Sequence, residues 1–450
     1  MRTLLLAGGV LALASFAAPA LGDTSSREVQ SAVDAYLASS KADTSLVGGA
    51  GQAGYDGGFW IRGGSFLMKI NLTLQTRWEG FDWDDTATEP RPGGDLSGFS
   101  LPRATLKFSG DATCDVHYYA ELEFGHSGDW FDNNNAQGAG FTNFHQRSIL
   151  DQTEGNPSAG YGTLREGWIE YETSPYLIFR MGLVKTPTTR QLMTPPEMQQ
   201  FVDVSMASAF IGQTMPGYTD RNRDYGALLH GAFGCDGEFQ YMLAITNGDG
   251  PVHRNVLDGT TDDCFAYSAR VNWDIKGHLG YEEGALRSHE CEWAASIGAW
   301  AHYYTDAAQH NPFSKFADKL EWGVDAAFAW GGFSFTAAYN AYDWETPVGS
   351  GVDGFSWFAQ AGYLFPGTAW ELAARYGAYE ANDQVSTSTT TEVGVAVNYY
   401  IDGHADKVTL DVAFLSPDDN GNIFADTYTG YSATGDSDAV LIRLQWQLAL

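Results

Sequence analysis

Basic residues are scarce in this sequence. Its 450 residues include 25 Lys and Arg against 56 Asp and Glu, giving a formal net charge of −31. Nucleic-acid binding needs clustered Lys and Arg to neutralise phosphates, so the charge balance excludes a nucleic-acid partner. Beyond residue 22 the sequence also lacks an apolar run long enough for a transmembrane helix, which excludes a helical membrane protein.

Cysteine and catalytic motifs are equally scarce. The four cysteines (Cys114, Cys235, Cys264 and Cys291) form no CxxC pair, so a structural zinc site is not expected and no particular disulfide is predicted. No GxSxG serine and no HExxH repeat accompanies the ten histidines. We therefore predict no enzyme, no metal site and no cofactor, and expect His117 and His302 to line a wall.

Alternation with a period of two is abundant. From Phe66 to Glu79 the even positions are mainly apolar, and the odd positions from Lys69 onward are polar or charged. This pattern predicts a β-strand with one apolar and one hydrated face. At about 3.3 Å per residue, such a strand crosses a bilayer even when tilted.

The same alternation recurs in sixteen segments after Phe59, and their connections alternate between tight turns and long loops. We predict an all-β fold, a transmembrane antiparallel up-and-down β-barrel of sixteen strands over residues 59–450. Residues 1–22 are expected to be a signal peptide, and residues 23–58 a periplasmic leader with a short helix and a linker. One connection, Ile275–Cys291, falls on the short-turn side and is long.

The side chains opposite the apolar set are expected to face a water-filled lumen, because a sixteen-stranded barrel is too wide for side chains to fill. The predicted basic lining residues, for anions, are Lys69, Arg77, Arg103, Lys107, Arg180, Lys185 and Arg190. The predicted acidic wall is formed by Glu121, Glu123, Glu166 and Glu170. Facing rows of opposite charge would orient dipolar solutes and set ion preference, and the simpler alternative is that they pair across strands.

The long loop Lys185–Arg223 is the best candidate for a constriction. It carries apolar residues that must be buried, namely Leu192, Met193, Met198, Phe201, Val202, Met206, Phe210 and Ile211. Folding into the barrel would bury them, and the competing interpretation is an outer lid or a trimer latch. Other loops are acidic, including Asp82, Asp84, Asp85, Glu89 and Asp95, and such a mouth should repel free anions.

Several stretches resemble the phosphate-selective porin O and P family. They are the first strand, LPRATLKFSG (Leu101–Gly110), EGWIEY (Glu166–Tyr171), MGLVKTP (Met181–Pro187) followed by QFVD (Gln200–Asp203), RDYG (Arg223–Gly226), TNG (Thr246–Gly248) and RLQW (Arg443–Trp446). The resemblance spans Phe59–Leu450 and implies a sixteen-stranded, trimeric outer-membrane porin with an inward-folded third loop. Two positions depart from the pattern: Val204 stands where the family commonly has arginine, and Leu450 where barrels commonly end in an aromatic residue.

We therefore predict a porin in a bacterial-type outer membrane, surrounded by its lipid and passing small hydrophilic solutes or inorganic anions such as phosphate. The expected assembly is a homotrimer. A surface adhesin or envelope scaffold with an occluded lumen is the alternative function. A barrel hydrolase is a third hypothesis, disfavoured because the sequence offers no recognisable nucleophile and base.

Overall fold

A computed structural model describes residues 51–83, 96–125, 163–214, 223–248, 265–286, 292–304, 318–345, 351–385, 387–418, 422–424, 432–434 and 438–450. The predicted signal peptide, the short helix and the acidic loop residues Asp84–Asp95 lie outside these ranges. Among the described residues, no helix has the length and apolar character needed to cross a membrane.

All sixteen segments predicted from the alternation are strands, and they form one antiparallel sheet in chain order. They are β3 (Phe66–Trp83), β4 (Leu96–Asp111), β5 (Val116–Glu123), β6 (Thr163–Ser174), β7 (Leu177–Lys185), β8 (Arg223–Phe233), β9 (Phe239–Thr246), β10 (Ala266–Lys276), β11 (Ala294–Tyr304), β12 (Lys319–Trp330), β13 (Phe333–Glu345), β14 (Gly351–Leu364), β15 (Trp370–Glu380), β16 (Thr389–Asp402), β17 (Asp406–Pro417) and β20 (Ala439–Ala449). A small hairpin of β18 (Asn422–Phe424) and β19 (Ser432–Thr434) lies between β17 and β20.

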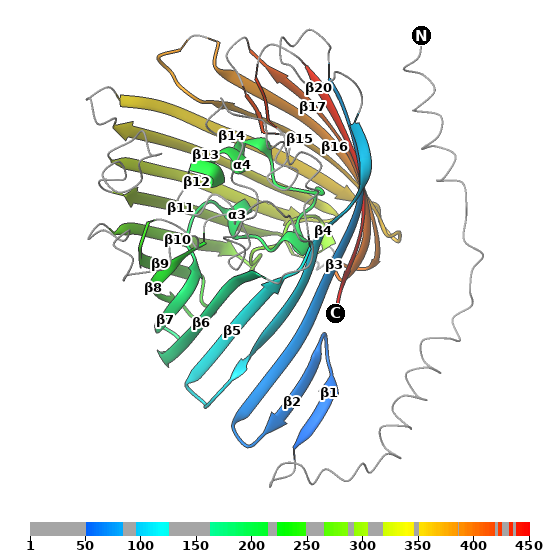
Figure 1. The fold of residues 1–450 in the computed structure, drawn as a ribbon. Helices are drawn as coiled ribbons and strands as arrows, with labels where there is room; N and C mark the ends of the chain where they lie inside the picture. The colour runs from blue at the N-terminus through cyan, green and yellow to red at the C-terminus, as the bar shows by residue number, and fades with distance from the viewer. Residues whose placement is uncertain are drawn as a thin grey trace, which may run out of the picture. The chain divides into compact units, whose positions relative to one another are not determined.

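The sheet closes because β20 pairs with β3, in a register that places Ala449 opposite Thr73 (Figure 1). The terminal residue completes this seam. The backbone N–H of Leu450 donates to the carbonyl of Leu72 at 2.8 Å, and the N–H of Leu72 donates back at 3.1 Å. Closure pairs the two edge strands, which is how a β-sheet satisfies its backbone groups in lipid.

The protein is apolar outside and polar inside, as the alternation predicts. Outward side chains such as Ile169 and Trp446 are 64% and 59% exposed, whereas inward Glu321 and Asn340 are 0% exposed. Aromatic residues gather outside near the short turns, where Trp370 and Tyr399 have ring centroids 4.6 Å apart. Such an aromatic belt is typical of barrels at the membrane–water interface.

Tight turns join neighbouring strands at one end of the barrel, as predicted. The Gly331–Gly332 turn between β12 and β13 has positive φ angles of 57° and 90°, which a two-residue hairpin turn of this type requires and glycine adopts at little cost. By the usual orientation of such barrels, this end is periplasmic.

Two short strands precede the barrel. β1 (Gln52–Tyr55) pairs with β2 (Phe59–Gly63), and β2 pairs with the first residues of β3. Residues 52–55 fall in the segment predicted to be linker and form a strand instead. Sequence reasoning missed this strand because four residues are too few to show a convincing alternation, and because glycines surround them.

Candidate functional site: the lumen and its third loop

The loop between β7 and β8, here called L3, comprises residues 186–222, of which 186–214 are described. It contains α3 (Arg190–Met193), the 3₁₀ turn η1 (Pro196–Met198) and α4 (Met206–Thr214). Figure 1 shows α3 and α4, in green, in the space that the barrel strands enclose. The predicted inward folding of this loop is therefore what the structure shows.

The apolar residues of L3 are buried against aromatic side chains of the inner wall. Leu192, Val204, Met206, Ala209, Phe210 and Ile211 form one cluster with wall residues that include Trp300, Tyr342, Trp344 and Tyr379. The ring of Phe210 stacks on that of Tyr379 with centroids 4.5 Å apart. Inward aromatic residues are unusual on a wall facing water, and this loop supplies the apolar surface that covers them.

L3 is held at its start by a buried ion pair. Arg270 on β10 and Asp325 on β12 lie 2.6 Å apart, with both side chains 1% exposed, and the backbone N–H of Arg190 donates to Asp325 at 3.0 Å. The pair reaches across β11 at Gly298, where a Cβ would lie 2.5 Å from the Arg270 guanidinium and 2.6 Å from the Asp325 carboxylate. Glycine at 298 therefore makes room for this contact.

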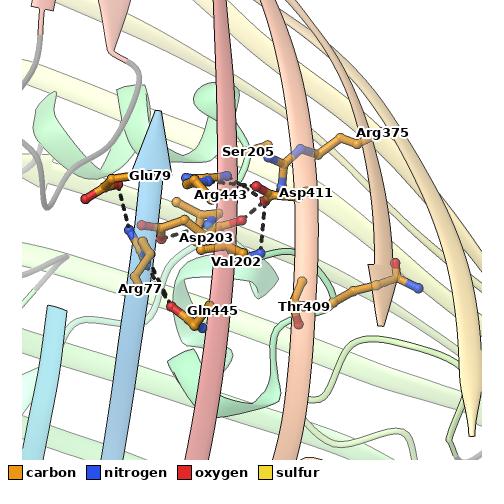
Figure 2. A network of polar contacts seen from close by, with 12 residues as sticks. Arg77, Glu79, Val202, Asp203, Ser205, Arg375, Thr409, Asp411, Arg443 and Gln445 are labelled. Carbon is orange, nitrogen blue, oxygen red and sulfur yellow. Dashed lines mark hydrogen bonds and ion pairs between the residues drawn. The ribbon is translucent and has the colours of Figure 1, made fainter. Parts of the chain in front are cut away.

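A second buried ion pair holds the middle of L3 (Figure 2). Arg443 on β20 donates to Asp411 on β17 at 2.7 and 2.9 Å, and the N–H of Val202 donates to the same carboxylate at 3.1 Å. The guanidinium of Arg375 donates to the carbonyl of Asp203 at 3.0 Å. Because charged partners strengthen such hydrogen bonds, these contacts fix the loop backbone directly to the wall.

The tip between these anchors is fixed through Gln200. Its side chain donates to Ser334 at 3.0 Å and to Glu371, and Asn398 donates to its carbonyl at 2.9 Å. A Cβ at Gly362 would overlap both the Gln200 amide and the Glu371 carboxylate, so the loop is seated in a gap that a glycine leaves.

Most of the predicted basic residues face inward and are paired. Arg77 donates to Gln445 at 3.0 Å and lies 3.6 Å from Glu79 (Figure 2), and Arg103 donates to Gln75.

Farther along the wall, Lys107 pairs with Glu197 of L3, and Arg180 pairs with Glu170 at 2.7 Å while its guanidinium lies 3.8 Å over the Trp168 ring.

The remaining three predicted basic residues differ from one another. The Lys185 ammonium donates to the carbonyl of Met193 at 3.2 Å, so it supports α3. Arg190 is buried within L3 and donates to the carbonyl of Gly280. Lys69 is exposed, at the level where β2 pairs with β3 near the periplasmic end.

The four predicted acidic residues line the same wall and contact basic partners. Glu121 lies 3.1 Å from Arg165, Glu166 lies 3.2 Å from Arg223, and Glu170 also contacts His230 at 2.8 Å.

Glu123 accepts from the N–H of Gly125 at 2.8 Å. The acidic and basic groups are thus interleaved as pairs rather than separated into opposed rows.

The inner wall has two differently exposed parts. The covered wall, the inward side of β10–β17, is buried, with Ser356 and Asn340 at 0%. The open wall, the inward side of β5–β9 with Lys107 and Ser109 of β4, is partly exposed at many positions, although Glu121, Glu170, Leu228 and Ala244 are buried. There the side chains of His117, Arg180 and Lys107 are 25%, 20% and 17% exposed.

Sequence reasoning missed the buried pairs of the covered wall. Arg270, Asp325, Arg375, Glu392, Asp411 and Arg443 all lie on inward positions that the alternation gives, yet their partners depend on the cross-strand register. It also missed Arg165 and Arg223, which face the acidic residues.

Nothing in the described part of the chain forms a group of three or more His, Cys, Asp or Glu that could hold a metal ion. Cys114 and Cys235 are free and exposed, and Cys264 and Cys291 lie outside the described residues. Ser268 and His302 lie 2.7 Å apart, but both are buried on the covered wall, where a substrate cannot reach them.

A closed barrel of sixteen antiparallel strands with an apolar outside, short turns at one end and an inward third loop defines the fold of a bacterial outer-membrane porin. Its apolar outer face places it in the outer membrane. Residues 302–448 match the family model described as phosphate-selective porin O and P, which confirms for that stretch the resemblance seen in the sequence. A comparison with curated protein sequences gives no match.

Solved structures share the fold at low sequence identity. An anion-selective porin from Comamonas acidovorans is 12% identical, with 85% of this chain and 99% of that chain covered and a TM-score of 0.55. The high-pH structure of Pseudomonas putida OprB is 11% identical over 85% of this chain and 94% of that one, with a TM-score of 0.54. Outer-membrane expressed OmpT of Vibrio cholerae is 9% identical over 86% and 99%, with a TM-score of 0.50.

Proposed function

We propose that this protein is a passive channel for small hydrophilic solutes and ions across the outer membrane. The observation that carries the proposal is the open wall: several of its polar and charged side chains, among them His117 and Arg180, stay partly exposed inside a closed barrel. Side chains alone do not fill a barrel of sixteen strands. L3 lies mainly against the opposite wall and reaches the open wall through the Lys107–Glu197 pair, so hydrated space is left beside the open wall.

The paired charges of the open wall support passage of hydrated solutes without tight binding. Lys107, Arg180 and His230 each have a carboxylate partner within the wall or L3. A solute meets a wall of alternating donors and acceptors, so it can exchange water hydrogen bonds for wall hydrogen bonds as it moves. Conduction requires such contacts to be favourable and weak.

The seven predicted basic residues remain the candidates for an anion preference. The more specific prediction is that the preferred anion is phosphate. The family match and the anion-selective porin that shares the fold favour it. Two features of the lumen act against it: the arginines are the more buried members of several pairs, such as Arg223 with Glu166, and Val204 packs in the apolar cluster of L3. We therefore propose a weakly charge-selective channel.

Planar-bilayer recording tests the function and the selectivity together. Purified protein should add stepwise, ohmic current, and its reversal potential under a salt gradient should lie near zero. Block of chloride current by added phosphate would establish the phosphate preference instead. Absence of current from protein whose barrel is folded would favour the alternative, an adhesin or scaffold with an occluded lumen.

The homotrimer and the absence of catalysis also stay predictions. The mass of the protein–detergent complex measures the oligomeric state, and a trimer should persist in mild detergent.

The absence of catalysis is tested at Ser268. Because the Ser268–His302 contact is buried, we expect no ester hydrolysis. Ester hydrolysis by the wild type that is lost in Ser268→Ala would contradict this prediction.

A further inference from the structure

The long periplasmic connection between β10 and β11 has no role in the proposal so far. Residues 277–286, the longer of its two described stretches, would be expected at the rim, yet Leu279, Glu283 and Ala285 are buried. Leu279 packs on Ala327 and Ala329 of β12. Ala285 packs with Leu364 of β14 and Tyr400 of β16, several strands away from β12 along the covered wall. The segment therefore runs across the inside of the barrel.

This segment meets L3 along its length. The carboxylate of Glu283 accepts from the Gln191 side chain at 2.9 Å and from the backbone N–H of Gln200 at 3.0 Å. In return the N–H of Glu283 donates to the carbonyl of Met198 at 2.9 Å. One acidic residue of the periplasmic turn therefore contacts L3 at three separate residues.

A second contact lies nearer the start of the turn. The guanidinium groups of Arg190 and Arg270 lie 5.6 and 5.5 Å from the centre of the Tyr281 ring, and the Arg270 side chain donates to the Tyr281 hydroxyl at 3.0 Å. The ring thus joins a residue of L3 to the ion pair that anchors it. At the other end, His404 of the β16–β17 turn contacts the carbonyl of Glu283 at 3.0 Å.

We infer that residues 186–214 of L3 and residues 277–286 of the periplasmic connection together form a plug that closes the covered half of the lumen. Glu283 is the positioning residue that holds the two segments together. The inference rests on the proposed channel function for its meaning, since the plug confines solutes to the open wall. Glu283 suits this role because a carboxylate accepts two hydrogen bonds at once, and bonds to a charged group are stronger than those to a neutral one.

A thiol-accessibility experiment tests the plug without relying on current. Ser296 on β11 is 1% exposed and pairs with Ala327, which Leu279 covers. In a chain with the four native cysteines replaced by serine, Ser296→Cys should react slowly with a water-soluble maleimide. Adding Glu283→Gln should accelerate the reaction at least about tenfold, which corresponds to about 1.4 kcal/mol of easier opening.

Glu292→Gln is the matched control, because Glu292 lies in the same connection but is exposed and pairs only with Lys276 among the contacts described for it. It should leave the rate unchanged. If Glu283→Gln does not fold, Gln191→Ala removes one of the three contacts of Glu283 from the L3 side and should also accelerate the reaction, by a smaller factor. An unchanged rate in the folded variant overturns the inference.

Current recording separates this inference from the proposed function. With the plug loosened, Glu283→Gln should show brief excursions above the wild-type current level, because the covered half becomes passable. A silent wild-type channel combined with accelerated thiol reaction would leave the plug standing and reject the channel.

Discussion

Individual charged residues of the covered wall act by pairing rather than by meeting solutes. Arg270 with Asp325 and Arg443 with Asp411 are almost fully buried, and each carboxylate also accepts a backbone N–H from L3. Removing one partner of such a pair leaves a buried charge that neither water nor protein compensates.

Arg270→Met should therefore lower the free energy of unfolding by about 3–5 kcal/mol, as measured by denaturant titration of tryptophan fluorescence in detergent. Lys276→Met on the same strand is the control, because the Lys276–Glu292 pair is exposed and worth about 0–1 kcal/mol. Equal losses in the two variants would show that the buried pair has no special weight.

Glycines on the covered wall make a second prediction at this scale. Gly362→Ala should displace Gln200 and Glu371, because a Cβ overlaps both, and the thermal midpoint should fall. Gly351→Ala on the same strand meets nothing closer than 3.8 Å and should leave the midpoint within a degree or so of wild type. Similar midpoints in the two variants would contradict the tight seating of L3.

At the scale of elements, the sequence determines which strands form and which faces they present. The period of two sufficed for all sixteen strands and for the outward apolar face, since both follow from local geometry. The apolar residues of the long loop Lys185–Arg223 also identified L3 as a segment that must be buried. The destination of residues 277–286 and the partners of the inward charges depend on register and on contacts between segments far apart in sequence, which no local pattern encodes.

L3 also has an anchor that responds to pH. Burial alone would raise the pKa of Glu197, but the Lys107 ammonium outweighs it, so the pKa lies below its ordinary value of 4.5. The ion pair therefore stabilises the seated loop above pH 4.5, and this contribution is lost as the pH falls through the lowered pKa.

We expect steady single-channel current above pH 4.5 and added fluctuation at lower pH. Glu197→Gln should fluctuate at both, whereas Glu345→Gln, at an exposed site on β13, should behave as wild type. A Glu197→Gln channel as quiet as wild type at neutral pH would show that this anchor does not hold L3.

The whole barrel has an inside-out distribution of residues with an asymmetric lumen. Its exterior is aromatic and aliphatic, one inner wall is covered by the plug, and the other carries partly exposed charges. The sparse basic residues are consistent with this arrangement, because most of those within the described barrel neutralise a nearby carboxylate. Solutes are therefore confined to one side of the lumen.

The most direct test compares one cysteine on each wall during single-channel recording. Ser109 lies on the open wall and Ser356 on the covered wall. In a background without native cysteines, a charged methanethiosulfonate reagent should reduce the current of Ser109→Cys and leave that of Ser356→Cys unchanged. Reduction of the Ser356→Cys current with no effect on Ser109→Cys would contradict the account.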